Sequence, residues 1–145
     1  MAREDFVFFH SLRVRWAEVD MQGIVFNGHY LTYFDVAFTE YWRATDLPTV
    51  IQQAQEGREM FARKASIEYQ SPACFDDMLD IGVRCAGIGR SSLRFLLEIH
   101  RGGTHLVSGE LVYVYADTSV RQSIPLPDRW RETLARFEKL PPVAL

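Results

Sequence analysis

The residues between Ala17 and Trp42 have the types and spacing needed to attack an activated carbonyl group. Asp20 ends an apolar stretch, Gly23 lets the chain bend, and Asn27 precedes a long aromatic segment with the period of a helix. A helix start offers free backbone N–H groups and positive potential, so a carbonyl oxygen could be polarised there while Asp20 faces its carbon. This order predicts an acyl-transfer site.

Each of these residues also has a purely structural interpretation. An aspartate before a glycine is often only a turn former. Gly23 is either a turn residue or a point where an acyl chain passes close to the backbone, and the Asn27 side chain suits a helix cap. Glu18 is more typical of a salt-bridged or solvated partner than of a catalytic group.

The elements that must hold these residues follow from the hydrophobic pattern. Alternation predicts antiparallel strands over residues 6–16, 61–70, 79–85, 93–99 and 106–116. Helical spacing predicts a long helix over 28–43, a short helix within 45–57 and a terminal helix opening at Pro127.

The apolar stripe of the long helix, Leu31, Phe34, Phe38 and Trp42, is wide enough to predict burial. Short turns between the strands make this an α+β fold, with an antiparallel five-stranded sheet wrapped around one long central helix. We expect residues 1–145 to form a single domain, with the tail after Pro141 frayed.

Composition excludes several classes of function. The net charge of −3 and the pI of about 5.8 argue against a nucleic-acid partner, and no stretch approaches the roughly 20 apolar residues of a membrane span. Two cysteines without a CxxC pair favour a cytoplasmic location. The four histidines lack metal-binding spacing, so we expect no metal and no resident cofactor.

Three motifs carry a family resemblance. They are VRWAEVDMQGIVFNGHYLTYFD at residues 14–35, RKASIEYQSPACFDDMLDI at 63–81 and GRSSL at 89–93. With the strand pattern they make the chain, from about Phe8 to Pro127, resemble the hotdog-fold acyl-CoA thioesterases of the 4-hydroxybenzoyl-CoA thioesterase family, especially the YbgC-like branch. The resemblance implies the hotdog fold and a thioester hydrolase.

The resemblance also implies roles for individual residues. A short-chain or aromatic acyl-CoA would be hydrolysed to free acid and CoA, with Asp20 as nucleophile or general base and the backbone N–H of Asn27 facing the thioester oxygen. Gly23 belongs to the same catalytic segment. Homodimers or homotetramers would carry the active sites between subunits. The positions assigned to substrate binding are Arg90, Ser91, Ser92 and Tyr30, of which the first three are candidates for holding the CoA phosphates.

This chain departs from the family pattern at one position, and two other functions are also compatible with its residues. YbgC-like members usually carry histidine where this chain has Asn27. A carrier-linked substrate, on acidic acyl carrier protein, would need a basic surface around Arg84, Arg90 and Arg94. A non-catalytic protein that binds acyl thioesters could use the same pocket.

Overall fold

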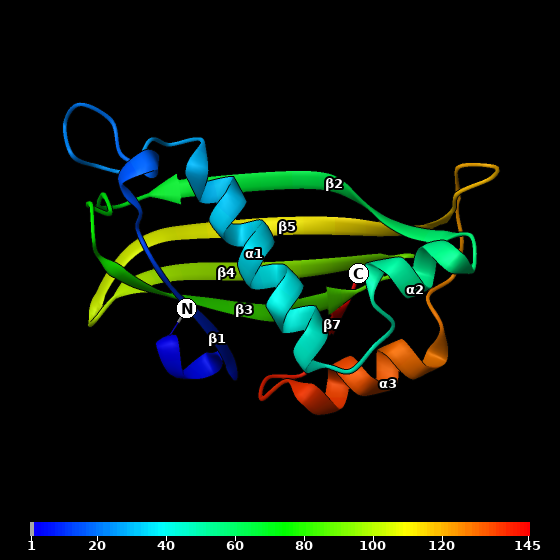
Figure 1. Ribbon diagram of the computed structural model, residues 1–145. Helices are drawn as coiled ribbons and strands as arrows, with labels where there is room; N and C mark the ends of the chain where they lie inside the picture. Colours follow the sequence, from blue (N-terminus) through cyan, green and yellow to red (C-terminus); the bar gives the residue numbers. More distant parts are fainter. Residues whose placement is uncertain (1) are drawn as a thin grey trace.

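A curved antiparallel sheet with one long helix lying across its face dominates the computed structural model, which describes residues 2–145 (Figure 1). The main strands lie in the order β1-β3-β4-β5-β2. They are β1 (Phe8–Arg13), β2 (Arg58–Tyr69), β3 (Met78–Ile88), β4 (Ser92–Arg101) and β5 (Thr104–Asp117). The helices are α1 (His29–Ala44), α2 (Val50–Gln55) and α3 (Asp128–Phe137), with short 3-10 turns η1 (Arg3–Asp5) and η2 (Trp16–Glu18). The predicted α+β class and the five strands are confirmed.

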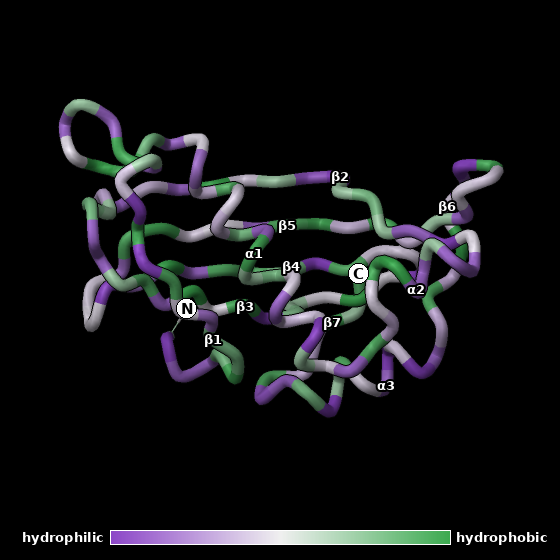
Figure 2. Tube along the Cα trace, in the orientation of Figure 1, coloured by the Kyte–Doolittle hydropathy of each residue, from purple (hydrophilic) through white to green (hydrophobic). Residues whose placement is uncertain are grey.

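Helix α1 packs closely on the middle of the sheet. A Cβ atom at Gly109 of β5 would lie 2.1 Å from Cε2 of Phe34, so only glycine lets the helix approach this strand. The core between them holds aromatic side chains of α1 and the apolar faces of β3, β4 and β5, and Figure 2 shows apolar stretches along β5. The predicted burial is correct for one face of α1, whereas Leu31 is 45% exposed.

The helix boundaries differ slightly from the predicted ones. Helix α1 begins at His29 and its N-cap residue is Gly28, without a side-chain cap, so the predicted Asn27 cap is wrong. The short helix α2 is capped by Thr49, which accepts a hydrogen bond from the backbone N–H of Gln52 at 3.2 Å. Helix α3 follows Pro127 as predicted.

Two segments behave differently from their local pattern. Trp16 leaves the first strand for η2, where its ring meets Phe75 edge-on and remains 73% exposed. The tail does not fray: β7 (Val143–Ala144) pairs in parallel with β3, and the N–H of Leu145 donates to the carbonyl of Ile88. A further short strand, β6 (Gln122–Ser123), pairs with β5.

Strand β2 forms an open edge of the sheet. It pairs with β5 on one side, and most of its residues are exposed. Lys64, a charged residue of the kind that protects an edge strand from pairing with another chain, bonds Glu110 of β5 at 2.8 Å. None of the helices within residues 2–145 is long and apolar enough to cross a membrane.

Candidate active site

Asp20 lies in a tight hairpin turn between η2 and α1. Its Oδ1 accepts the N–H of Gln22 at 2.8 Å, and its carbonyl accepts the N–H of Gly23 at 2.9 Å. Gly23 has a φ of +78°, so the conformation of the turn accounts for a glycine at this position. The turn-forming interpretation of both residues is confirmed, and the carboxylate keeps one oxygen without a partner among the described residues.

The loop that carries Asp20 is attached to the turn between β2 and β3. The N–H of Val25 donates to Ala73 O at 2.8 Å, and the N–H of Phe75 donates to Gly23 O at 3.2 Å. That second turn is held by Asp77, whose Oδ2 accepts the N–H of Cys74 at 2.8 Å. These bonds place the first two sequence motifs side by side, although they are separate in the chain.

The start of α1 opens into a cavity of about 300 Å³. The residues that line it include Ile24, Asn27, Tyr30 and Tyr69. The backbone N–H groups of Asn27 and Gly28 have no hydrogen-bond partner within residues 2–145. An oxygen in this cavity could therefore accept bonds at the positive end of the helix.

Tyr30 forms part of the cavity wall. Its side chain is 2% exposed, and its hydroxyl accepts the N–H of Ala73 at 3.0 Å. Its ring meets Tyr69 of β2 at 5.4 Å between centroids. Burial raises the pKa of the Tyr30 hydroxyl, so this side chain gives the cavity wall an aromatic ring and a neutral hydroxyl.

Asp20 is not among the residues that line this cavity. Its side chain is exposed in the single chain, whereas Asn27 and Tyr30 reach the cavity wall. Tyr69 of the edge strand β2 lines the cavity and is itself 52% exposed, so the chain alone leaves this side of the site uncovered.

Glu18 supports the turn from inside. It is buried and accepts bonds from Tyr33 Oη of α1 at 3.0 Å and from the backbone N–H of Arg15 at 2.8 Å. The Arg15 guanidinium adds bonds at 2.9 and 3.1 Å. Desolvation opposes ionisation of Glu18, but the bonds from Arg15 and Tyr33 outweigh it and lower the pKa of the carboxyl. Glu18 is thus a structural ion-pair partner, as its position suggested.

The substrate-binding candidates Arg90, Ser91 and Ser92 lie at the other end of the sheet. Ser92 is aligned through β5 with Phe61 at the beginning of β2, whereas Tyr69 at its end adjoins Asn27. Eight strand residues separate these two levels by roughly 26 Å. One chain therefore does not bring Arg90 to Asp20.

A family model described as the thioesterase-like superfamily matches residues 14–134 of this fold. The chain belongs to the thioesterase-like superfamily. It is a thioester hydrolase, as its motifs predict. The match includes the turn of Asp20, helix α1 and the whole main sheet from β2 onward.

Individual relatives agree with this membership. An acyl-CoA thioester hydrolase, YbgC of Escherichia coli O6:H1, is 29% identical over 134 residues, which cover 92% of this chain and 97% of that protein. The acyl-CoA thioesterase YbgC of Haemophilus influenzae is 22% identical over 92% of this chain and 96% of its own length. A solved 1,4-dihydroxy-2-naphthoyl-CoA thioesterase from Synechocystis superposes with a TM-score of 0.81 at 20% identity, covering 88% of this chain and 94% of that one. The hotdog fold is confirmed.

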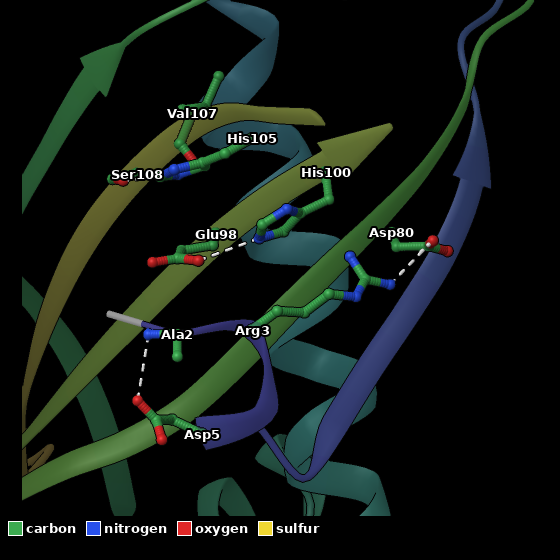
Figure 3. Close-up of polar contacts among 9 residues, drawn as sticks. All are labelled: Ala2, Arg3, Asp5, Asp80, Glu98, His100, His105, Val107 and Ser108. Carbon is green, nitrogen blue, oxygen red and sulfur yellow. Dashed lines mark hydrogen bonds and ion pairs between the residues drawn. The ribbon is translucent and has the colours of Figure 1, made fainter. Parts of the chain in front are cut away.

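A polar row on the outer face of the sheet of this thioesterase escaped the sequence analysis (Figure 3). His100 Nε2 bonds Glu98 at 3.0 Å, and Ser108 Oγ bonds His105 Nε2 at 2.8 Å, with the two imidazole rings stacked at 5.0 Å. Turn η1 lies beside them, where Arg3 bonds Asp80 at 3.3 Å. No group of three or more metal-binding side chains occurs in the described part of the chain.

A second unpredicted network closes the far end of α1. Buried Glu138, after α3, accepts bonds from the Tyr41 hydroxyl and from the N–H of Cys85, the latter at 2.8 Å. Desolvation raises the pKa of Glu138, and burial raises that of the Cys85 thiol to about 12. Both cysteines are free, and Cys85 is inert as a nucleophile because its thiolate is disfavoured.

The basic surface proposed for acyl carrier protein is not formed by the three arginines together. Arg84 is buried, and Arg94 is bonded to Glu110 at 2.7 Å, which leaves Arg90 as the exposed member of the set.

Proposed function

We propose that this protein hydrolyses acyl-CoA thioesters of short-chain or aromatic acids, with Asp20 and the start of α1 as the reacting centre. The observation that carries the proposal is the pair of free N–H groups at Asn27 and Gly28, because Asn27 lines a cavity at the start of α1 and the turn that holds the Asp20 carboxylate directly precedes this segment. The Escherichia coli relative, an acyl-CoA thioester hydrolase, supports the same substrate class.

The chemistry needs few groups because a thioester carbonyl is already activated. In one route Asp20 removes a proton from water, the hydroxide attacks the carbonyl carbon, and the C–S bond breaks to release CoA thiolate and the acid. In the other route Asp20 attacks directly, and water then hydrolyses the mixed anhydride. In both routes the N–H of Asn27 stabilises the oxyanion.

The open side of the site supports a homodimer, or a homotetramer of two dimers, as the active species. A second chain would cover the opening beside β2 and could bring its own Arg90, Ser91 and Ser92 toward the CoA phosphates. CoA is part of the substrate, so the reaction uses no resident cofactor or metal. A cytoplasmic location remains a prediction.

Replacing Asp20 tests this function. Asp20→Asn keeps the bond from the N–H of Gln22 but removes the charge and the base, so kcat/KM for acyl-CoA should fall at least about a hundredfold. Thiol release from a panel of acyl-CoA and aroyl-CoA esters measures the effect. The melting temperature should change little, because Asn also suits an exposed turn.

Asp46→Asn provides the matched control. Asp46 is also exposed and has a φ of +61°, which asparagine tolerates, but it lies after α1 rather than before it. Its activity should equal that of the wild type. Thiol release by Asp20→Asn at the wild-type rate would show that another residue carries the reaction.

A further inference from the structure

The β3–β4 turn, residues 89–92, has all four of its backbone carbonyl groups hydrogen-bonded. The N–H of Gly89 donates to Ser92 O at 2.8 Å, which closes the turn. The N–H of Tyr115, on β5, donates to Ser91 O at 2.8 Å. The other two carbonyls are bonded by the segment around α3, which is distant in the chain. The turn therefore presents no carbonyl group that lacks a donor.

The donor groups of the same turn are unbonded. The backbone N–H groups of Arg90 and Ser91 have no hydrogen-bond partner in the described part of the chain, and neither do the hydroxyls of Ser91 and Ser92. The Arg90 side chain is exposed and forms no ion pair with the described residues. Free donors beside bonded carbonyls suit an anion, because a phosphate oxygen accepts hydrogen bonds and is repelled by carbonyl oxygens.

Arg131 of α3 holds the first two carbonyls of the turn. Its Nη2 donates to Gly89 O and to Arg90 O, each at 2.8 Å. The N–H of Leu126 also donates to Arg90 O at 2.8 Å. In a trans peptide the carbonyl of one residue lies opposite the N–H of the next, so these bonds also fix the N–H groups of Arg90 and Ser91. The guanidinium thus sets the direction of both free N–H groups.

The elements on both sides of the turn are fixed independently of Arg131. Trp130 and Leu134 anchor α3 in the core, where they are 3% and 0% exposed. The strand that leads into the turn is held by β7, which pairs with Gly87 and Ile88 of β3. Loss of the Arg131 side chain should therefore free the turn without releasing the helix or the strand.

We propose that Arg131 is a positioning residue for substrate binding, which holds the free N–H groups of Arg90 and Ser91 toward the phosphates of acyl-CoA. This inference rests on the proposed function and extends it to a residue of α3 that acts through the turn. Without Arg131 the peptide planes of the turn can rotate and present carbonyl oxygens to the phosphates. Binding of the CoA part then weakens, whereas the reaction of the thioester is unchanged.

Arg131→Met tests this role, because methionine keeps an apolar stem but has no donor group. For the acyl-CoA that the wild type hydrolyses fastest, KM should rise about tenfold, and kcat should change less than about twofold. The same acyl group on N-acetylcysteamine forms a thioester without phosphates, and its kcat/KM should stay within about twofold of the wild-type value. A general folding defect would instead lower the activity on both substrates equally.

Two further variants make the test specific to the Arg131 donor. Arg131→Lys keeps a charged donor on a shorter side chain, so its KM for acyl-CoA should lie between those of the wild type and Arg131→Met. Arg136→Met removes the same charge from the exposed last turn of α3 and should leave KM unchanged. A rise in KM as large as that of Arg131→Met would assign the effect to net charge and overturn the proposal.

A double variant distinguishes positioning from a direct contact between Arg131 and a phosphate. If Arg131 acts through the turn, Arg90→Gln and Arg131→Met together should raise KM by less than the product of the two single factors. Two independent contacts would multiply. Multiplying factors, an unchanged KM in Arg131→Met, or an equal loss on the N-acetylcysteamine ester would each overturn the proposal.

The two levels of the account fail separately. Wild-type activity of Asp20→Asn would overturn the proposed function. An inactive Asp20→Asn variant, together with a wild-type KM in Arg131→Met, would overturn the positioning role of Arg131 and leave Asp20 as the catalytic carboxylate.

Discussion

Two buried glutamates, one near each end of α1, bond to tyrosines of the same helix, but their pKa values are shifted in opposite directions. Glu18 bonds Tyr33 and is held by the Arg15 guanidinium, which helps to lower its pKa. Glu138 bonds Tyr41 and the N–H of Cys85, and desolvation raises its pKa although the charge of Arg84 opposes this. Comparable contacts therefore accompany a lowered pKa at one end of the helix and a raised pKa at the other.

The difference matches the roles of the two ends. At the start of α1 the backbone N–H groups are free, the turn of Asp20 is exposed, and a cavity opens. At its end, Trp42 meets Trp130 and Tyr41 meets Phe137 edge-on, which closes the core under α3. Glu18, which is paired with an exposed arginine, stabilises the loop that carries the candidate site. Glu138, whose pKa is raised by desolvation, stabilises the closed core under α3.

The largest effect on stability should come from breaking the closed end. Glu138→Ala leaves the Tyr41 hydroxyl and the Cys85 N–H buried without an acceptor, so the free energy of unfolding should fall by about 3 kcal/mol. Glu138→Gln keeps an acceptor and should lose about 1 kcal/mol or less. Urea denaturation measures both, with Glu132→Ala on the exposed face of α3 as a neutral control. If Glu138→Ala were as stable as the Glu132→Ala control, Glu138 would have no structural role at this end of α1.

A smaller effect is expected at the open end. Glu18→Ala removes the acceptor of Tyr33 Oη, but the Arg15 side chain that it also releases is largely exposed, at 76%. The free energy of unfolding should fall by about 2 kcal/mol, measured in the same urea titration. A loss larger than that of Glu138→Ala would reverse the comparison.

The smallest expected effect, and the one that best distinguishes Glu18 from Glu138, is the opposite pH dependence of their contributions to the free energy of unfolding. The lowered pKa of Glu18 means that its stabilisation is present above the unfolded-state pKa, near about 4.3, and is lost as pH falls through the folded-state value. The raised pKa of Glu138 means that its stabilisation is present at low pH and is lost as pH rises through the folded-state value.

Glutamine variants measure the direction of the pH dependence at Glu18 and at Glu138 separately. The stability difference between wild type and Glu18→Gln should shrink toward low pH, whereas the difference between wild type and Glu138→Gln should shrink toward high pH. Urea titrations over a pH series measure both differences. Parallel curves for the two variants would show that the pKa values of the two glutamates are shifted in the same direction on folding.

Much of this fold can be predicted from the local pattern of apolar and polar residues. Alternation located the strands because β3 and β4 turn one apolar face toward α1, and helical spacing located α3 from Trp130 and Leu134. Gly23 marked the turn after Asp20 through its backbone conformation. Local sequence therefore reveals the elements and the segment that carries the candidate site.

Contacts between distant segments were not accessible in this way. The bond from Tyr41 to Glu138 joins residues 97 positions apart, and it depends on how α3 returns to the sheet. Leu31 fits the apolar stripe of α1 by spacing, yet its side chain is exposed because nothing in this chain covers that part of the helix. The position of Arg90, at the far end of the sheet from Asp20, follows from strand register rather than from its neighbours in sequence.

The central claim is that the carbonyl of the substrate lies at the start of α1, and a crystal structure of the oligomer with a non-hydrolysable ketone or thioether analogue of an acyl-CoA tests it most directly. The account predicts the ketone oxygen, or the corresponding position in the thioether, about 3 Å from the Asn27 nitrogen, with the Asp20 carboxylate facing the adjacent carbon. An analogue bound with its acyl linkage away from both groups, and with Asp20 still directed into solvent, would contradict it.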